Sequence, residues 1–525
     1  MQGRTWHEVT SALLVVCASA AAPLPAQERP LVVSGGHYFD VASGEMRPNG
    51  GIVSIGGRLM AVGSTTVDVD LSEAERIELK PDEYVLPGLV DLHAHYNVQL
   101  LGLPRLEELV ATPVLWLANG VTSTFPAGEY DPEAMWALRQ RIDRGEQPGP
   151  RLYNSGPYYG SARPGWSRMT REELFAEVDL WAARGARGFK AKGPDPETLR
   201  WLIERAHQHG LTVTGHLDSG FRNSVNPRDA ILMGIDRIEH FMGGPAFPPD
   251  RSAYASFPDF RPGTPDFEEI VALYKRHDVT YDPTVTAYAA YYGIEAKQDP
   301  TLEFWTDESR FLTPEVRRWI EERGPDFNLA EFDRIHAVKC PLVKEFHEAG
   351  GRLALATDHP SWGVWLPGFV AHRELHALTL CGISEADVLQ IATLNGALAF
   401  GISDLLGSLE VGKLADFFVV RGNPLEDIRH TRDVRWVVKS GELYDPAVLL
   451  ESIEGTMGPR RAGARRDRGS GASRAAVYHR VDVHPGAHGC EDEHVAGVDG
   501  IALQLTAPYE VEKRGNRSDG AVAQP

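Results

Sequence analysis

The sequence is poor in cysteine and in basic residues, and these shortages exclude several classes of protein. Its 525 residues include only 4 cysteines, Cys17, Cys340, Cys381 and Cys490. Their spacing is irregular and an odd number remains once Cys17 is removed with a leader, so we expect no disulfide framework. Lysine and arginine total 53 against 73 acidic residues, which gives a formal net charge of -20. Because phosphate binding needs a basic face, we do not expect nucleic acid as a partner.

Long apolar runs are also scarce, and the one near the N-terminus is short. Arg4 precedes an apolar stretch from Ser11 to Ala22, and Leu24-Pro25-Ala26 follows it. This order is typical of a secretory signal cleaved after Ala26, and the stretch is too short for a comfortable membrane span. We therefore expect residues 1–26 to be a signal peptide, no integral membrane span, and an exported protein, either periplasmic or extracellular. Lipid anchoring at Cys17 is the alternative.

Two histidines one residue apart form the most informative motif. His93 and His95 follow the apolar, β-prone run from Tyr84 to Leu92. Side chains two positions apart on a strand point the same way, so both imidazoles can bind one metal ion at the end of a strand. Alone, such a pair is equally compatible with hydrogen-bonded core histidines. The other potential ligands in the chain decide between these interpretations.

Four further segments share one design, an apolar β-rich run that contains or ends in a potential metal ligand. They are residues 188–192 with Lys190 and Lys192, residues 211–216 with His216, residues 237–240 with His240, and residues 353–358 with Asp358. Amphipathic helical patterns lie between them, at residues 172–184, 196–209, 313–323 and 340–349. Strands that alternate with helices imply a parallel sheet, and ligands at the carboxyl ends of several strands favour a (β/α)8 TIM barrel over an open sheet.

In order and residue type, one set of side chains resembles the binuclear metal ligands of the amidohydrolase superfamily: His93, His95, Lys190, His216, His240 and Asp358. The step from His216 to His240, ending in Gly234-Ile235-Asp236-Arg237-Ile238-Glu239-His240, resembles the branch that contains Xaa-Pro dipeptidases and imidazolonepropionase-related hydrolases. The segments 393–397 and 407–416 resemble the path out of that family's barrel into a small β domain.

The resemblance implies an α/β fold with three parts after the signal peptide. We expect a TIM barrel at residues 85–400 and a small β-sandwich domain built from both flanks, residues 27–84 and 401–446. From residue 455 to 525, arginines cluster among glycine, alanine and serine and the hydrophobic periodicity fades. This composition predicts a disordered tail. Unrelated appended sequence explains the loss of pattern equally well.

The charge of two adjacent cations restricts the role of the lysine. Two divalent metal ions repel each other unless anionic ligands bridge them, and an ammonium group would increase the repulsion. In the family that the chain resembles, the lysine at the position of Lys190 reacts with carbon dioxide to form a carbamate that bridges both metals. Lys192 lies on the same face of the strand and is the competing candidate. The ligands suit zinc, manganese, cobalt and iron alike, and zinc is the metal we expect.

The resemblance predicts an enzyme, a metal-dependent hydrolase of carbon–nitrogen (amide or peptide) bonds. A hydroxide that bridges the metals would attack the carbonyl, and Asp358 would act as general acid and base. The substrate would be a dipeptide, an imidoproline or an N-acyl amino acid. The alternatives are a cyclic-amide, lactone or phosphotriester hydrolase on the same site, a deaminase, or a non-catalytic relative that binds metal. A homo-oligomer is compatible with the sequence, which does not determine the oligomeric state.

Overall fold

The computed structural model describes residues 30–98, 106–163, 165–289, 308–323, 329–359 and 366–458. The predicted signal peptide, residues 1–26, lies outside these ranges, as does the predicted tail from residue 459 onward. Residues 455–458, which we expected to belong to the tail, pack against the body of the protein. Met457 is fully buried, and its backbone N–H donates to the carbonyl of Phe311 at 2.9 Å.

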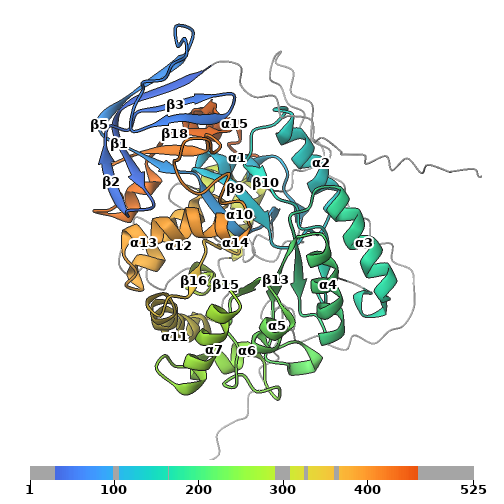
Figure 1. Ribbon diagram of the computed structural model, residues 1–525. Helices are drawn as coiled ribbons and strands as arrows, with labels where there is room; N and C mark the ends of the chain where they lie inside the picture. The colour runs from blue at the N-terminus through green and yellow to red at the C-terminus, as the bar shows by residue number, and fades with distance from the viewer. Residues whose placement is uncertain are drawn as a thin grey trace, which may run out of the picture.

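In the described part of the chain, nine short parallel strands form the centre of the molecule (Figure 1). A three-stranded sheet has the order β10-β9-β6, with β6 at Leu89–Ala94, β9 at Val121–Pro126 and β10 at Arg151–Leu152. A six-stranded sheet runs from β11 to β16 in chain order: β11 (Tyr158–Tyr159), β12 (Gly188–Lys192), β13 (Thr212–His216), β14 (Arg237–Glu239), β15 (Thr280–Asp282) and β16 (Arg352–Leu353). The fold is therefore of the α/β class and its central strands are parallel, as predicted.

The two parallel sheets contact each other at both ends without forming one continuous ladder. Leu92 N donates to Leu355 O at 2.9 Å, and Asp358 N donates to His93 O at 2.9 Å, so β6 lies beside the segment that follows β16. On the other side, an isolated parallel bridge pairs Glu129, which follows β9, with Pro157, which directly precedes β11. The closed ladder of the predicted TIM barrel is not seen among the described residues.

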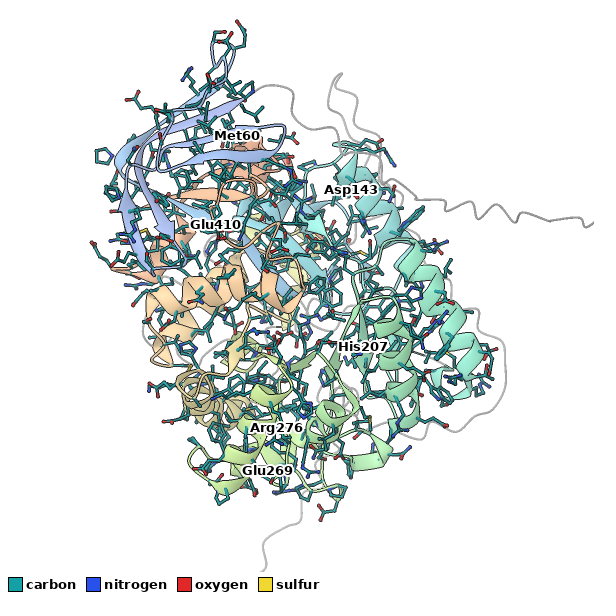
Figure 2. All side chains as sticks on the ribbon, viewed as in Figure 1. Met60, Asp143, His207, Glu269, Arg276 and Glu410 are labelled. Atoms are coloured by element: carbon teal, nitrogen blue, oxygen red, sulfur yellow. A yellow bond between two sulfur atoms is a disulfide. The ribbon has the colours of Figure 1, made fainter. Side chains whose placement is uncertain are left out.

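Helices follow most of these strands and begin at residues that favour a helix start. Thr170 and Glu173 form a capping box at α3 (Arg171–Ala183), and Asp195 caps α4 (Pro196–Gln208). In α7 (Pro265–Arg276), Phe267 and Ile270 are buried, whereas Glu269 and Arg276 are exposed on the outer surface (Figure 2). The other α-helices are α1 (Ala111–Ala118), α2 (Pro132–Asp143), α5 (Pro227–Met233), α6 (Ala253–Ser256), α8 (Val285–Ala289), α10 (Pro314–Arg323), α11 (Leu329–Glu348), α12 (Phe369–Leu380), α13 (Glu385–Gln390), α14 (Gly396–Ala399) and α15 (Pro446–Ser452). None of the helices in the described ranges is long and apolar enough to cross a bilayer.

Strands from both flanks join in one eight-stranded sheet, with the order β19-β18-β17-β5-β1-β3-β4 and β2 paired to β1. They are β1 (Leu31–Asp40), β2 (Glu45–Pro48), β3 (Ile52–Ile55), β4 (Arg58–Val62), β5 (Glu75–Pro87), β17 (Phe417–Arg421), β18 (Val434–Lys439) and β19 (Glu442–Tyr444). The flanks meet where β5 pairs with β17, so both ends of the parallel core are tied together (Figure 1). The predicted sandwich is not confirmed, because the described flanking strands belong to a single sheet.

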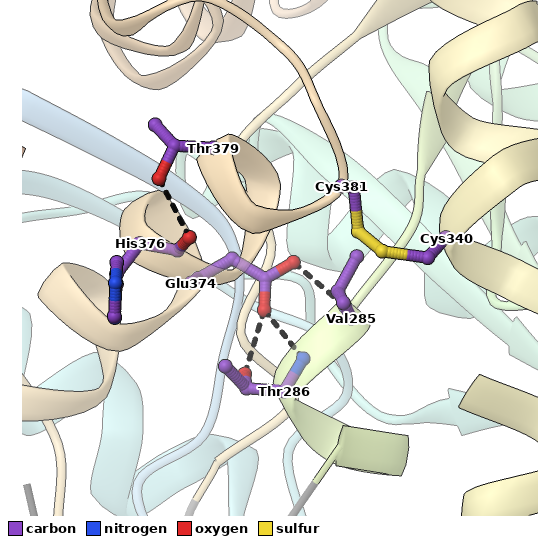
Figure 3. The surroundings of a disulfide bond; sticks show 7 residues. All are labelled: Val285, Thr286, Cys340, Glu374, His376, Thr379 and Cys381. Carbon is purple, nitrogen blue, oxygen red and sulfur yellow. Dashed lines mark hydrogen bonds between the residues drawn. A yellow bond between two sulfur atoms is a disulfide. The ribbon is translucent and has the colours of Figure 1, made fainter. Parts of the chain in front are cut away.

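A disulfide joins Cys340 in α11 to Cys381 at the end of α12 (Figure 3). The expectation of no disulfide framework is therefore wrong for this pair. The cysteines are 41 residues apart on two helices, and only the packing of those helices brings them together. By the loop-entropy model, a cross-link over a loop of this length stabilises the fold by about 4 kcal/mol.

Candidate metal centre

The six side chains predicted as ligands meet at the carboxyl ends of five parallel strands. They are His93 and His95 at the end of β6, Lys190 in β12, His216 at the end of β13, His240 directly after β14, and Asp358 after β16. None of the six is more than 7% exposed. Since parallel strands end at the same edge of a sheet, the repeated strand-then-ligand pattern brings residues from distant parts of the chain together.

Asp358 lies at the centre of the histidines. Its Oδ1 is 2.9 Å from Nε2 of His95 and 3.2 Å from Nε2 of His93. Its Oδ2 is 3.7 Å from Nε2 of His240. The ring of His240 lies 5.0 Å from that of His93 and 4.5 Å from that of His216, measured between centroids. One carboxylate therefore faces histidines from two separate strands.

Lys190 forms a buried ion pair with Glu239, a residue that sequence reasoning did not include in the site. Glu239 Oε2 lies 3.5 Å from Nδ1 of His93 and 3.8 Å from Nε2 of His240, and Oε1 accepts a hydrogen bond from the Thr214 hydroxyl at 3.0 Å. The carboxylate is fully buried. The centre therefore contains two carboxylates rather than one.

The two lysines of β12 occupy different environments. Lys190 is 1% exposed and contacts Glu239, whereas Lys192 is half-buried, pairs in register with His216, and lies 6.0 Å from the centre of the Tyr158 ring. Strand alternation places both on one face, with Lys192 nearer the end of the strand. Lys190 is thus the lysine in contact with the inner carboxylate.

Left-handed backbone at two ligands ends the strand alternation. His240 has a φ of 61° and Asp358 a φ of 57°. Such values for residues other than glycine are uncommon and cost about 1–3 kcal/mol each, so they persist only where the surroundings hold them. Here His240 N donates to Asp282 O at 3.0 Å, and Asp358 N donates to His93 O at 2.9 Å. Because the alternation ends at His240, Glu239 and His240 both reach the centre.

Burial and charge set the protonation states that metal binding needs. Burial lowers the pKa of His216 and of His240 well below the ordinary value, and lowers the pKa of His95 to about 4. These imidazoles are therefore neutral and have a lone pair to donate. Burial acts to raise the pKa of Asp358, but electrostatic interactions with the neighbouring imidazoles and hydrogen bonds to them outweigh it and hold that pKa well below its usual range.

The donor atoms of the centre fit divalent cations. Two overlapping groups have all their donor atoms within 4.8 Å of one another: His93, His240 and Asp358, and His216, Glu239 and His240. Among the six predicted ligands, four buried imidazole nitrogens have no hydrogen-bond partner: Nδ1 of His93, Nδ1 of His95, Nε2 of His216 and Nε2 of His240. Buried polar atoms are almost always satisfied, so such a concentration in one place indicates a missing partner that accepts lone pairs.

A third group of potential ligands, His336, Cys340 and Cys381, lies elsewhere in the described part of the chain. Its two cysteines form the disulfide between α11 and α12 and have no thiolate to donate. This group therefore does not compete with the histidine and carboxylate centre for a metal.

Comparison with known proteins supports the family resemblance that the sequence motifs indicated. The model of the Amidohydrolase family matches residues 84–444. The chain is 24% identical to imidazolonepropionase of Sphingopyxis alaskensis over 353 residues, which cover 65% of this chain and 79% of that protein. It is 26% identical to N-substituted formamide deformylase of Arthrobacter pascens, but over only 27% of this chain and 25% of that enzyme. Among solved structures, a Xaa-Pro dipeptidase with methionine bound in its active site matches with a TM-score of 0.58 and 22% identity, covering 79% of this chain and 100% of that one.

Proposed function

The chain belongs to the amidohydrolase family, and from this premise we propose that it is an amide hydrolase with two divalent metal ions at its catalytic centre. One observation carries the proposal: six ligands chosen from the sequence converge, together with Glu239, in one buried cluster. A non-catalytic relative would be expected to lack some of the six ligand residues, and this chain has all six.

The geometry favours one division of the ligands. His93, His95 and Asp358 would hold one cation, and His216 and His240 the other. Lys190 would bridge the two as a carbamate, releasing its present ion pair with Glu239. Carbamate, Asp358 and Glu239 would then bring three negative charges against the four positive charges of the cations, which an ammonium at Lys190 could not do. Zinc suits these donors, as do manganese, cobalt and iron.

The residues of the chain supply the proton transfers. When bound, the cations lower the pKa of a water molecule to about 7 and polarise the substrate carbonyl. Asp358, whose Oδ1 lies 3.2 Å from Nε2 of His93 and 2.9 Å from Nε2 of His95, would accept the proton of the attacking water and pass it to the leaving nitrogen. The products are an acid and an amine. Because the cluster is buried, bulk water is largely excluded, which strengthens each electrostatic interaction.

A dipeptide, an imidoproline or an N-acyl amino acid is the substrate class we favour, because an amide between an acyl group and an amine uses every part of this chemistry. The likeness in fold to a Xaa-Pro dipeptidase supports it. The second candidate is a cyclic amide, supported by the match to imidazolonepropionase over 79% of that enzyme.

Two further expectations fit the same proposal. Hydrogen bonds between β6 and the segment after β16, and the bridge between Glu129 and Pro157, support one (β/α)8 barrel made of both parallel sheets. Export to the periplasm or the outside is supported by the Cys340–Cys381 disulfide, because structural disulfides are typical of oxidising compartments.

Metal-loaded enzyme should be tested against five substrate types: dipeptides including Xaa-Pro, N-acyl amino acids, cyclic amides, lactones and phosphotriesters. We expect the highest kcat/KM for a dipeptide or an N-acyl amino acid. The Asp358→Asn variant, purified identically, is the control for contaminating hydrolases. Turnover confined to lactones or phosphotriesters would contradict amide hydrolysis, and no turnover of any substrate by a metal-loaded enzyme would indicate a non-catalytic relative.

A further inference from the structure

The turn after β15 contacts His240 through the imidazole. Thr284 Oγ1 lies 2.7 Å from Nδ1 of His240, and the same hydroxyl donates to the carbonyl of Pro283 at 2.8 Å. A hydroxyl has one proton to donate. Since that proton goes to Pro283, Thr284 satisfies both contacts only by accepting a hydrogen bond from His240. The Nδ1 atom must then carry the hydrogen of the neutral ring.

The backbone groups of His240 are also hydrogen-bonded, and only Nε2 of the ring has no hydrogen-bond partner. The backbone N–H donates to Asp282 O at 3.0 Å. The backbone carbonyl accepts from the Tyr281 hydroxyl at 2.6 Å and from Nζ of Lys339 at 2.9 Å. Nε2 is buried without a hydrogen-bond partner and faces Asp358 and Glu239, at 3.7 and 3.8 Å. With the hydrogen on Nδ1, the lone pair of the ring points at the two carboxylates.

Thr284 itself is held in an unfavourable conformation. Its φ is 46°, in the left-handed region that a β-branched residue rarely adopts. Glu374 of α12 fixes the next two residues, because its carboxylate accepts from Val285 N at 2.7 Å, Thr286 N at 2.7 Å and the Thr286 hydroxyl at 2.6 Å (Figure 3). Glu374 is fully buried. The left-handed turn at Thr284 is thus anchored from the neighbouring helix.

Both helices that hold this region are covalently joined. Lys339, which donates to His240, precedes Cys340 in α11, and the disulfide connects Cys340 to Cys381 at the end of α12, the helix of Glu374 (Figure 3). His240 and its turn are therefore supported on two sides by one cross-linked helix pair. This arrangement limits the freedom of the imidazole to rotate or shift.

We propose that Thr284 is a positioning residue that selects the Nδ1-protonated tautomer of His240 and so presents Nε2 as a metal ligand, with Glu374 holding Thr284 in place. The inference rests on the proposed metal centre. With the other tautomer, Thr284 would lose one of its two hydrogen bonds, and Nε2–H would point at the cation. Metal binding would then require a change of tautomer first.

Nitrogen-15 NMR of histidine side chains in metal-free protein reads the tautomer directly. We expect the Nδ1–H form at His240, assigned by comparison with His240→Gln, and a mixture of tautomers in Thr284→Val. Direct titration with zinc should show an affinity lower by a factor of about 10–100 in Thr284→Val, the usual effect of losing a partner of a ligand histidine. Thr284→Ser keeps the hydroxyl and should bind zinc within a few-fold of the wild type.

The chain offers a matched control in Thr431, which lies 3.1 Å from Nδ1 of His372 and donates to Ile428 O at 2.7 Å. Thr431→Val removes the same pair of contacts outside the candidate centre and should leave zinc affinity unchanged. An Nε2–H tautomer at His240 in the wild type, or unchanged zinc affinity in a folded Thr284→Val protein, would overturn the inference. If Thr284→Val does not fold, the NMR measurement of the His240 tautomer in the wild type still tests the inference. Failure of the wild type to bind zinc would instead overturn the proposed function, which the tautomer measurement does not depend on.

Discussion

Asp358→Asn is expected to lower kcat by a factor on the order of 10² or more while much of the metal stays bound. The asparagine keeps an oxygen that can face His93 and His95, which lie 3.2 and 2.9 Å from Oδ1 of Asp358. It cannot accept the proton of the attacking water or deliver it to the leaving nitrogen. Steady-state kinetics on the best substrate of the panel, together with metal analysis of the same preparation, checks the prediction.

A control must separate loss of a proton carrier from loss of a buried charge. Asp416 is 5% exposed and pairs with Arg151 at 3.3 Å, next to the flanking sheet and outside the centre. Asp416→Asn should therefore reduce stability without a matching loss of kcat per folded molecule. Near wild-type kcat in Asp358→Asn would contradict the assignment of Asp358 as general acid and base.

Lys190→Ala is expected to remove most of the bound metal and most of the activity, because it deletes the proposed bridging carbamate. Metal content per folded chain is the measurement, determined after gel filtration to remove unfolded protein. In the metal-free protein the substitution also leaves Glu239 buried without its ion-pair partner, which costs about 3–5 kcal/mol. A thermal melt is therefore needed alongside the metal analysis.

Lys192→Ala is the matched control, since it lies two residues further on the same face of β12 and is half-buried. It should retain metal. Addition of a short-chain carboxylic acid to Lys190→Ala should restore part of the activity, since the acid can occupy the space of the carbamate. A fully active Lys190→Ala protein, or loss of metal only in Lys192→Ala, would transfer the bridging role away from Lys190.

The convergence of the ligands could be predicted because each followed an apolar strand. The carboxyl ends of parallel strands lie at one edge of a sheet. The hydrophobic pattern of each segment was therefore enough to predict that His93, His216 and His240 lie at that edge. The order of the metal-ligating residue types then gave the family. The same reasoning left Lys190 and Lys192 open, because alternation puts both on one face and does not give their depth in the sheet.

Glu239 and Thr284 were missed because local backbone geometry decides their role. Alternation in a strand predicts that Glu239 faces away from its neighbour His240, and the left-handed φ of 61° at His240 removes that expectation. Thr284 has a φ of 46° that no propensity predicts for a β-branched residue. Its conformation depends on the hydrogen bonds that Val285 and Thr286 donate to Glu374, which is about 90 residues away in the sequence.

The flanking domain and the disulfide show where pairing over long distances limits such reasoning. The family resemblance implied that the two flanks would fold together, and in the described residues β5 pairs with β17. The register that joins the eight strands into one sheet is not encoded in any one segment. Likewise, Cys340 and Cys381 meet because α11 and α12 pack together, which their irregular spacing could not indicate.

Metal analysis combined with anomalous diffraction tests the central claim most directly. We expect about two divalent cations per chain, one within ligand distance of His93, His95 and Asp358, the other of His216 and His240, and both of a carboxylated Lys190. Metal content near zero after supplementation, or cations bound away from these residues, would contradict the proposed centre.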